Sequence, residues 1–379
     1  MDVELIMEVA KKMEETASIK RGVATIGFDG FTDTIVRVVR GLGPDRAPLH
    51  FRSKRDFGQE IVGLGPDNSS FDLTRIATKM GGNGPNTSHA LGRLGVHVNC
   101  IGMLGRPEIH DLFGVMDPNC TLHSYAEPTQ TIALEFEDGK LLLAGNEILR
   151  TADWPTVRDA IGLAHLRALY DDSDIIGFAN WGEVEHATDI WEGVEREILS
   201  ALAPGRRRIV FFDLADPSRR NRDFARLAAL VERLSAHHET VLCLNRNEAF
   251  AIGRQLSLPA PTGLEDLGAA IYDRLRVDTL VMRDPHDAMA WTKAGLVKTA
   301  TFHTPEPRIS TGGGDNFNAG YCFARLEGFE PRAALTIASA VAGLYVATAH
   351  SPTRADVVDF LKQMAMSAAA RLPMQEAAT

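Results

Sequence analysis

The sequence predicts an α/β fold of three layers, with a mostly parallel central sheet and a small β-sheet lid. From about residue 150 onward, short apolar runs typical of buried strands alternate with helical patterns. Such alternation indicates parallel βαβ units with helices on both faces of the sheet. Two β-rich stretches, at about residues 34–62 and 128–146, stand apart from this alternation and are predicted to form the lid. The predicted strands of the main sheet include 175–178, 209–212, 240–244 and 279–282, with a helix at 224–236.

Local patterns predict the remaining elements. Four apolar residues recur at helical spacing near the N-terminus and indicate an amphipathic helix over residues 2–16. The apolar run 23–28 predicts a buried strand that ends at Asp29, on the sheet edge where α/β proteins bind ligands. In the second lid stretch, two apolar runs are joined across Asp138-Gly139, which is a strong hairpin signal. Two further helices are predicted at 332–349 and 356–364.

Chain length sets the expected domain organisation. The chain has 379 residues, more than the roughly 250–300 that a single core usually holds. One large domain with appended segments fits this length, and so do two domains; we expect one domain over residues 21–365. Residues 1–20 form a helical extension that either packs on this domain or makes a contact in a homodimer. Residues 366–379 form a C-terminal tail.

Composition argues against several functional classes. The formal net charge is −10, from 40 basic and 50 acidic residues, which argues against general binding to nucleic acids or anionic membranes. No run of about 18 apolar residues could span a membrane, and the acidic N-terminal segment is not a signal peptide. The four cysteines are widely spaced without a CxxC pair, which predicts free thiols in a reducing cytoplasm. A cytoplasmic protein that acts on a small molecule is therefore expected.

Residues 310–320, with the sequence STGGGDNFNAG, carry the clearest chemical signal. Three consecutive glycines at 312–314 run into Asp315, and a helix is predicted over 316–327 with Gly328 as its C-cap. Glycines leave backbone N–H groups uncovered, and a helix start adds unpaired N–H groups and the positive end of its dipole. This segment therefore predicts a phosphate cradle. A carboxylate at its mouth can accept the proton of an attacking hydroxyl, which indicates phosphoryl transfer to an alcohol.

A second glycine-rich segment, residues 81–95, reads GGNGPNTSHALGRLG. It predicts a turn that exposes backbone to a ligand and opens a helix, with Asn86 able to donate and accept hydrogen bonds. On its own, a tight turn before a closely packed helix explains it equally well. Upstream, Asp29 and Asp33 follow the first strand and together suit the hydroxyl groups of a polyol. For Asp29, capping of the turn beside Gly30 is the alternative.

In this order, the two glycine motifs resemble the signatures of the PfkB (ribokinase-like) family of carbohydrate and nucleoside kinases. GGNGPNTSHALGRLG is similar to the family's GG-x-G-x-N…A…LG, and TGGGDNFNAG is similar to its TGAGD-x-F-x-AG. The resemblance spans about residues 22–363 and includes segments at 128–139, 213–217, 245–248 and 351–352. It implies a ribokinase-like fold for the domain 21–365. The implied activity is ATP-dependent and Mg²⁺-dependent phosphorylation of a hydroxyl of a sugar or sugar-like molecule.

The resemblance also implies a role for each residue that matches a family motif. The expected catalytic residues are the base Asp315 and the anion hole formed by Gly312, Gly313 and Gly314. The expected substrate-binding residues are Asp29, Asp33, Gly82, Asn83 and Asn86. The residues expected to bind the cofactor ATP are Asn245, Thr311, Gly312 and Gly314, and Glu248 is expected to place Mg²⁺ through water.

One segment departs from the family pattern. Where the family has a T-x-G-x-x-G turn near the nucleotide, residues 282–288 read MRDPHDA and both glycines are lost. The donor nucleotide is therefore less well defined by the sequence than the chemistry. Within this segment, Arg283 is interpreted either as a phosphate contact or as a partner in a surface salt bridge.

Three functions remain open at this point. The paired Asp29 and Asp33 favour a sugar kinase. A nucleoside kinase of the same family needs a slot for a base, with Phe28, Phe31 and Trp181 as candidate walls. A catalytically weak sugar sensor on a kinase scaffold fits the lost glycines, but the complete glycine cradle beside the expected base counts against it. The particular sugar, the phosphorylated hydroxyl and the oligomeric state do not follow from the sequence.

Overall fold

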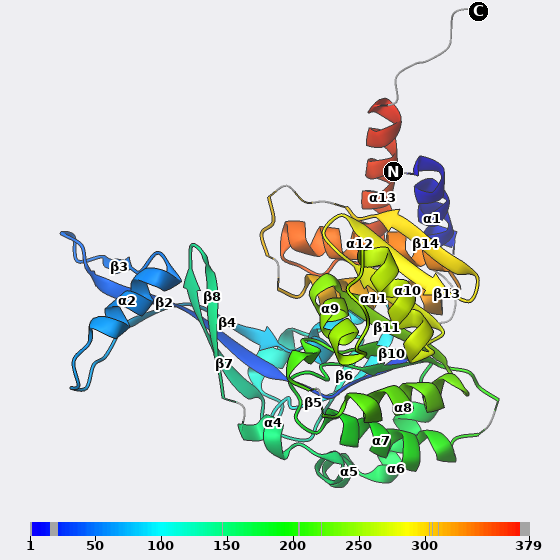
Figure 1. Ribbon diagram of the computed structural model, residues 1–379, viewed down its shortest axis with the longest axis horizontal. Helices are drawn as coiled ribbons and strands as arrows, with labels where there is room; N and C mark the ends of the chain where they lie inside the picture. Colours follow the sequence, from blue (N-terminus) through cyan, green and yellow to red (C-terminus); the bar gives the residue numbers. More distant parts are fainter. Residues whose placement is uncertain are drawn as a thin grey trace, which may run out of the picture.

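Two sheets organise the chain in this computed structural model (Figure 1). The structure describes residues 2–15, 22–145, 147–203, 205–220, 222–302, 304, 306–309 and 311–371. Within these residues the larger sheet has nine strands, in the order β14-β13-β12-β11-β10-β9-β1-β5-β6, and the smaller has five. The strands of the larger sheet are β1 (Val23–Gly27), β5 (His97–Gly102), β6 (Cys120–Ser124), β9 (Ile175–Phe178), β10 (Ile209–Asp213), β11 (Glu239–Asn245), β12 (Thr279–Arg283), β13 (Asp287–Thr292) and β14 (Gly295–Ala300). Those of the smaller sheet are β2 (Phe31–Leu42), β3 (Pro48–His50), β4 (Leu73–Gly81), β7 (Thr129–Phe136) and β8 (Gly139–Ala144).

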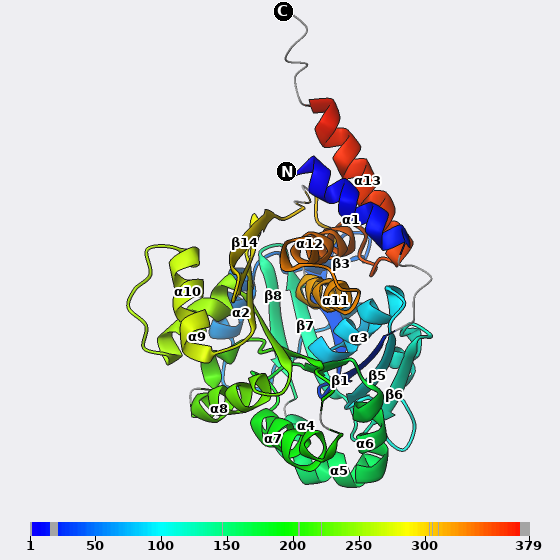
Figure 2. The same cartoon turned by 90° about the vertical axis from the view of Figure 1, so that its right-hand side faces the viewer.

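Helices cover both faces of the larger sheet, so the predicted three-layer α/β class is confirmed (Figure 2). The α-helices are α1 (Val3–Glu15), α2 (Lys54–Gly63), α3 (Asn83–Arg93), α4 (Glu147–Thr151), α5 (Trp154–Ile161), α6 (Leu163–Asp172), α7 (Ala187–Glu197), α8 (Phe224–Ser235), α9 (Arg246–Gln255), α10 (Leu264–Leu275), α11 (Gly313–Leu326), α12 (Pro331–Thr348) and α13 (Arg354–Arg371). Short 3₁₀ turns are η2 (Asp111–Val115), η3 (Leu199–Ala201) and η4 (Pro217–Arg219). Among the described residues, no helix has the length and apolar content needed to cross a bilayer.

The larger sheet is parallel from β6 to β12 and ends in the antiparallel strands β13 and β14. The four main-sheet strands predicted from the sequence are β9 to β12, and each boundary differs by at most one residue. Because parallel strands end at one edge, Asp213 and Asn245, the last residues of β10 and β11, share that edge with Asp29, just beyond β1. This edge carries the site described below.

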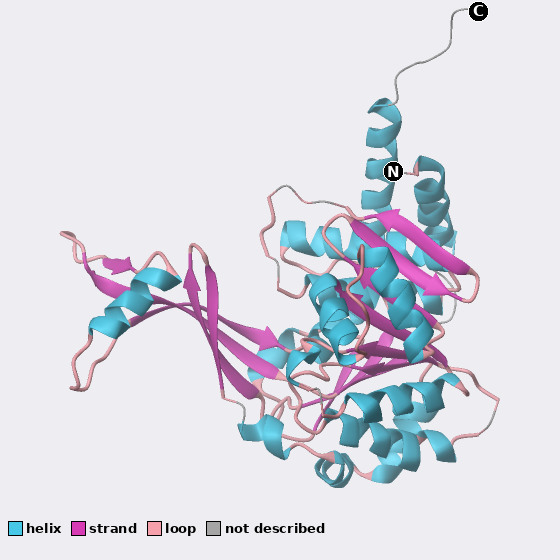
Figure 3. Ribbon diagram, in the orientation of Figure 1, coloured by secondary structure: helices cyan, strands magenta, loops and turns pink. Residues whose placement is uncertain are grey.

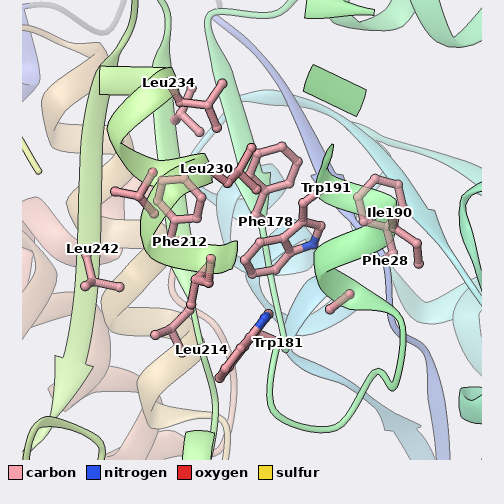
Figure 4. Packing of buried hydrophobic residues seen from close by; sticks show 14 of the residues in the cluster. Phe28, Phe178, Trp181, Ile190, Trp191, Phe212, Leu214, Leu230, Leu234 and Leu242 are labelled. Carbon is pink, nitrogen blue, oxygen red and sulfur yellow. The ribbon is translucent and has the colours of Figure 1, made fainter. Parts of the chain in front are cut away.

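Side chains of the larger sheet alternate between two hydrophobic cores, as the pleat of a strand requires. In β10, Val210 and Phe212 face the core beneath α5 to α10, while Phe211 faces the core beneath α3, α11 and α12. At the centre of the first core, the ring centroids of Phe178 and Trp191 lie 5.1 Å apart (Figure 4). The near-continuous apolar sequences of these strands follow from burial on both faces.

The smaller sheet combines both stretches predicted for the lid with one strand that was not predicted. β2 pairs with β3, β4 and β7, and the β7–β8 hairpin turns at Asp138-Gly139 as the sequence indicated. The additional strand is β4, whose mostly exposed residues lack the alternation of a half-buried strand. Figure 3 shows the sheet projecting from the main body, with α2 packed on it over a small core of aromatic and aliphatic residues.

The N-terminal helix packs on the domain, which is one of the two roles predicted for it. The four apolar residues of its helical pattern, Ile6, Val9, Ala10 and Met13, are buried in the second core. Arg354 at the start of α13 donates a hydrogen bond to the carbonyl oxygen of Met13. Residues 16–20 of the predicted extension lie outside the described residues.

Two boundaries near the C-terminus differ from prediction. The predicted tail begins inside α13, because strong helix formers continue that helix to Arg371, and residues 372–379 lie outside the described residues. The helix predicted to begin at Asn316 instead begins at Gly313, after Gly312 takes a left-handed N-cap conformation with φ of 89°. Asp315 therefore lies within the first turn of α11. Ser310, the first residue of the motif, lies outside the described residues.

Candidate active site

The candidate active site lies where α3 and α11 begin side by side, beyond the carboxyl edge of the larger sheet. The side-chain amide of Asn86, in α3, donates a hydrogen bond of 2.9 Å to Asp315 Oδ2, in α11. A cavity of about 690 Å³ opens beside this pair and is large enough for a small organic ligand. Its polar lining includes Asp33, Asn86, Thr311 and Asn316. The cavity thus joins the smaller sheet to the glycine-rich helix start.

Asp315 is buried among other acidic groups. Burial is the main reason that its pKa is raised well above the usual range, and the negative charge of Asp213 adds to the shift. The hydrogen bond from Asn86 and the positive charge of Arg283 act in the opposite direction. A carboxylate with a raised pKa is a better proton acceptor than an ordinary aspartate, which suits a general base.

The three glycines before Asp315 allow close packing around the helix start. Gly312 has a positive φ, and a Cβ there would lie 2.6 Å from the hydroxyl oxygen of Tyr345. That hydroxyl donates a hydrogen bond of 3.0 Å to the Thr311 carbonyl oxygen. At Gly314, a Cβ would overlap the guanidinium of Arg283. The first N–H groups of an α-helix have no partner within the helix, so this start can bind an anion.

Asp29 lies at the predicted sheet edge, but its carboxylate is bonded within the protein. Its side chain is fully buried and does not line the cavity. Its carboxylate accepts hydrogen bonds from the backbone N–H groups of Asn83 (2.7 Å) and Gly84 (2.8 Å) and from the side-chain amide of Asn180 (2.8 Å). Asp29 therefore anchors the start of α3, a role that is neither the predicted substrate contact nor the alternative capping of the turn beside Gly30.

Replacing Asp29 by alanine should destabilise the protein in a pH-dependent way. The three donors would lose their acceptor, and we expect a loss of roughly 2–4 kcal/mol in the free energy of unfolding at about pH 5. Burial raises the pKa of Asp29 to about 6, so its favourable contribution is complete at low pH and declines as pH rises through about 6. The loss caused by the substitution should therefore shrink towards about pH 7.5.

Urea unfolding at both pH values measures this loss. The matched control is Asp72→Ala, at an exposed aspartate of the smaller sheet's loops, which should change stability by less than about 0.5 kcal/mol at either pH. A loss at Asp29 that is equally small, or that grows with pH, would contradict its assignment as a buried anchor.

Asp33 and Asn86 both lie in the cavity lining, and their use in substrate binding stays a prediction. Asp33 is half-buried on β2, pairs in register with Lys79 of β4, and has its pKa raised mainly by burial. A Cβ at Gly81 would touch the Asp33 carboxylate, so glycine is needed for that carboxylate to lie beside the strand. Gly82 has a φ of 106° and turns the chain into α3. Its role is therefore to shape the turn.

The side chain of Asn83, by contrast, is hydrogen-bonded within the protein. Its side-chain amide donates a hydrogen bond of 3.1 Å to Asp213 Oδ2, which also accepts one of 2.9 Å from Asn318 in α11. Asp213 thus joins the starts of α3 and α11, although it was not among the predicted site residues. Its position at the end of a buried strand, like that of Asp29 just after β1, was the available signal.

Asn245 and Glu248 form a capping box at the start of α9 and do not line the cavity. Burial raises the pKa of Glu248 to about 8, and Asp213 and Asp216 contribute by repulsion. A cation nearby would offset that repulsion. No described cluster of three or more His, Cys, Asp or Glu side chains could hold a metal by itself. These residues therefore fit an Mg²⁺ ion that keeps most of its ligands as water and phosphate.

The aromatic residues considered as walls of a base-binding slot lie in the core. Phe28, Phe31 and Trp181 are all buried in the first hydrophobic core, and none lines the cavity. The Trp181 indole N–H donates to Thr188, as a buried tryptophan requires. Instead, the cavity continues along α3 past His89 and Arg93, which were not predicted. No aromatic slot favours a nucleoside among the predicted residues.

A glycine-rich helix start, a buried carboxylate and an adjoining polar cavity at the edge of a parallel sheet fit a carbohydrate kinase of ribokinase-like fold, and the comparisons with known proteins identify that class. A family model described as prokaryotic ketohexokinase matches residues 1–364. The chain belongs to that family. A ketohexokinase from Haloferax volcanii is 27% identical over 340 residues, which cover 88% of each chain.

Solved structures show the same fold at low sequence identity. Ribokinase from Thermotoga maritima has a TM-score of 0.59 and 16% identity, and the match covers 90% of this chain and 100% of that one. Arabidopsis thaliana ribokinase in complex with ribose and ATP has a TM-score of 0.61 and 16% identity, covering 91% and 99%. Ligand-free nucleoside kinase from Burkholderia thailandensis has a TM-score of 0.54 and 16% identity, covering 90% and 99%.

Proposed function

We propose that this protein transfers the γ-phosphoryl group of ATP, with Mg²⁺, to a hydroxyl of a ketohexose. The observation that carries the proposal is the pair formed by Asn86 and Asp315, because it places a buried carboxylate at the meeting point of a polar cavity and an anion-binding helix start. The ketohexokinase family and the Haloferax relative support a ketohexose as the acceptor. The Arabidopsis ribokinase complex with ATP supports the donor.

The proposal gives each residue a role that its position supports. Asp33 accepts hydrogen bonds from sugar hydroxyls, and Asn86 orients the Asp315 carboxylate. Asp315 accepts the proton of the reacting hydroxyl, and the N–H groups of Gly313 and Gly314 bind the oxygens of the transferred group. When bound, Mg²⁺ supplies neutralisation of phosphate charge, and Glu248 with Asn245 lies where water ligands of the ion can be held.

The test is an ADP-release assay on the full chain with Mg-ATP and a panel containing a ketohexose, ribose and a nucleoside. We expect turnover on the ketohexose, and ³¹P spectra of the product will identify the phosphorylated hydroxyl. Turnover on the nucleoside alone would establish a nucleoside kinase. No ADP release with any member of the panel, combined with a sugar-dependent rise in melting temperature, would establish the sensor.

Asp33→Asn tests the substrate side of the cavity. Loss of a charged acceptor for sugar hydroxyls should raise KM for the sugar roughly 10-fold to 100-fold, since hydrogen bonds to charged groups contribute about 1.5–3 kcal/mol. KM for ATP should stay unchanged. Asp72→Asn, at an exposed residue just before β4 and outside the cavity, is the matched control. An unchanged KM for the sugar in Asp33→Asn would remove Asp33 from the substrate site.

A further inference from the structure

Arg283 lies beside the glycine-rich helix start although its segment has lost the family's glycines. It is the last residue of β12 and pairs in register with Asn245 of β11. Its guanidinium carbon lies 5.4 Å from the ring centroid of Phe317, one turn into α11. Gly314 lacks the Cβ that would overlap this guanidinium. The strand, the aromatic ring and the glycine therefore fix the group against the first turn of α11.

The guanidinium lacks a carboxylate partner. No described carboxylate oxygen lies within 4.0 Å of its nitrogens, which excludes the surface salt bridge considered from the sequence. Its Nε atom is buried and has no hydrogen-bond partner. By comparison, the buried guanidinium groups of Arg208 and Arg220 each pair with a carboxylate, Asp171 and Asp223, although the Nε atom of Arg220 is also unpaired. Arg283 differs from both in having no carboxylate to balance its charge, which indicates that the guanidinium binds an anion.

The turn after Arg283 is built without glycine. Asp284 Oδ1 accepts hydrogen bonds of 2.8 Å from the backbone N–H groups of both His286 and Asp287. The Asp284 N–H donates one of 2.9 Å to the Asp287 carbonyl oxygen. The turn between β12 and β13 is therefore stabilised by the side chain of Asp284, whereas the family pattern has glycines in this turn. Although the glycines are absent, these hydrogen bonds hold the end of β12 in place and so fix the position of Arg283.

We propose that Arg283 is a phosphate clamp that binds the polyphosphate of the nucleotide and stabilises the phosphoryl group during transfer. The proposal rests on the proposed kinase function and assigns a residue to its nucleotide side. In the transfer, the sugar oxygen loses its proton to Asp315 and forms a bond to the γ-phosphorus, while the bond from that phosphorus to the β–γ bridging oxygen breaks and ADP leaves. Arg283 donates N–H groups to phosphate oxygens and exchanges no proton.

The charges around Arg283 agree with this role. Its positive charge lies near Asp315 and Glu248 and lowers the pKa of both carboxyl groups. Planar guanidinium groups bind phosphate through two parallel hydrogen bonds, which lysine cannot reproduce. Removal of Arg283 should therefore weaken binding of polyphosphate and move the acid limb of the activity profile to higher pH.

The experiment measures binding of inorganic tripolyphosphate, ADP and adenosine by calorimetry to wild type, Arg283→Gln and Arg283→Lys. We expect both variants to lose at least 10-fold in affinity for tripolyphosphate and ADP, with adenosine and sugar binding unchanged. The kcat of Arg283→Gln should fall about 100-fold or more, as on removal of one transition-state donor. Added guanidinium should restore part of this loss. Arg276→Ala is the control, because Arg276 is an exposed arginine just before β12, far from the site, and pairs with Glu232.

Each outcome decides one point. Wild type that binds sugar but neither tripolyphosphate nor ADP would overturn the proposed donor. Wild-type affinity for tripolyphosphate in Arg283→Gln would overturn the clamp alone. A variant that loses sugar binding together with phosphate binding would show that Arg283 only packs against Phe317. Full activity in Arg283→Lys would show that the charge suffices and the planar fork does not matter.

Discussion

Replacing Asp315 by asparagine should lower kcat by about 100-fold or more while sugar binding is retained, because the amide cannot accept the proton of the attacking hydroxyl. The change is nearly isosteric. The side-chain amide of Asn86, which donates to Asp315 Oδ2, can donate instead to the side-chain carbonyl oxygen of the substituted asparagine. The loss should therefore appear in kcat rather than in KM. Initial rates with the ketohexose and Mg-ATP measure both constants.

Although Asp315→Asn should lower kcat, it should raise the stability of the folded protein relative to wild type. Burial raises the pKa of Asp315 in the folded state. The favourable contribution of such a group is complete below its unfolded pKa and is lost as pH rises through the folded value. Asparagine does not ionise, so Asp315→Asn should become more stable than wild type as pH rises. Asp359→Asn, at an exposed aspartate of α13, should change neither property. Near wild-type turnover in Asp315→Asn would remove Asp315 as the base.

Gly312→Ala should lower kcat roughly 100-fold, since displacement of a catalytic group by about 1 Å is enough for a loss of that size. The new Cβ would meet the Tyr345 hydroxyl at 2.6 Å and would force a left-handed conformation on alanine. The Tyr345 hydroxyl is itself bonded to Thr311, so relief of the overlap moves the loop away from α12. The N–H groups of the first turn of α11 would then no longer converge on one point.

The matched control for Gly312→Ala is Gly328→Ala, just beyond the other end of the same helix. Gly328 also has a positive φ, of 72°, but a Cβ there meets nothing within 4 Å. Both substitutions share the backbone strain of about 1 kcal/mol or more, which thermal unfolding will show. Only Gly312→Ala should lose turnover. Equal kinetic losses in the two variants would mean that strain in α11, rather than displacement of the loop, is responsible.

Features encoded in a short continuous segment could be predicted from the sequence. The glycine run and Asp315 identified the start of α11, and the alternation of apolar runs identified β9 to β12 within one residue. β4 was missed because an exposed strand has neither an apolar run nor clean alternation. The start of α11 was placed three residues late, since glycines disfavour a helix interior but are tolerated in its first turn.

The roles of the individual carboxylates were harder to predict. Asp29 lies between β1 and β2 and Asp33 only four residues later on β2, yet Asp29 is fully buried beneath α3 and Asp33 lines the cavity. Their difference depends on donors from Asn83, Gly84 and Asn180, which reach Asp29 only after the sheet has formed. The same holds for Asp213, whose importance comes from two asparagines on separate helices. Such contacts cannot be inferred from the spacing of residues along the chain.

The hydrogen bond between Asn86 and Asp315 joins residues 229 positions apart, and the bond between Asn83 and Asp213 spans 130. During synthesis on the ribosome, Asp29 and the start of α3 emerge long before the helix that completes their network. Contacts of such long range are typical of slow folding and of intermediates in larger chains. Several carboxylates and amides of this network therefore lack their protein partners until the later part of the chain has been synthesised. Enzymatic activity therefore indicates that the last hydrogen bonds of this network have formed.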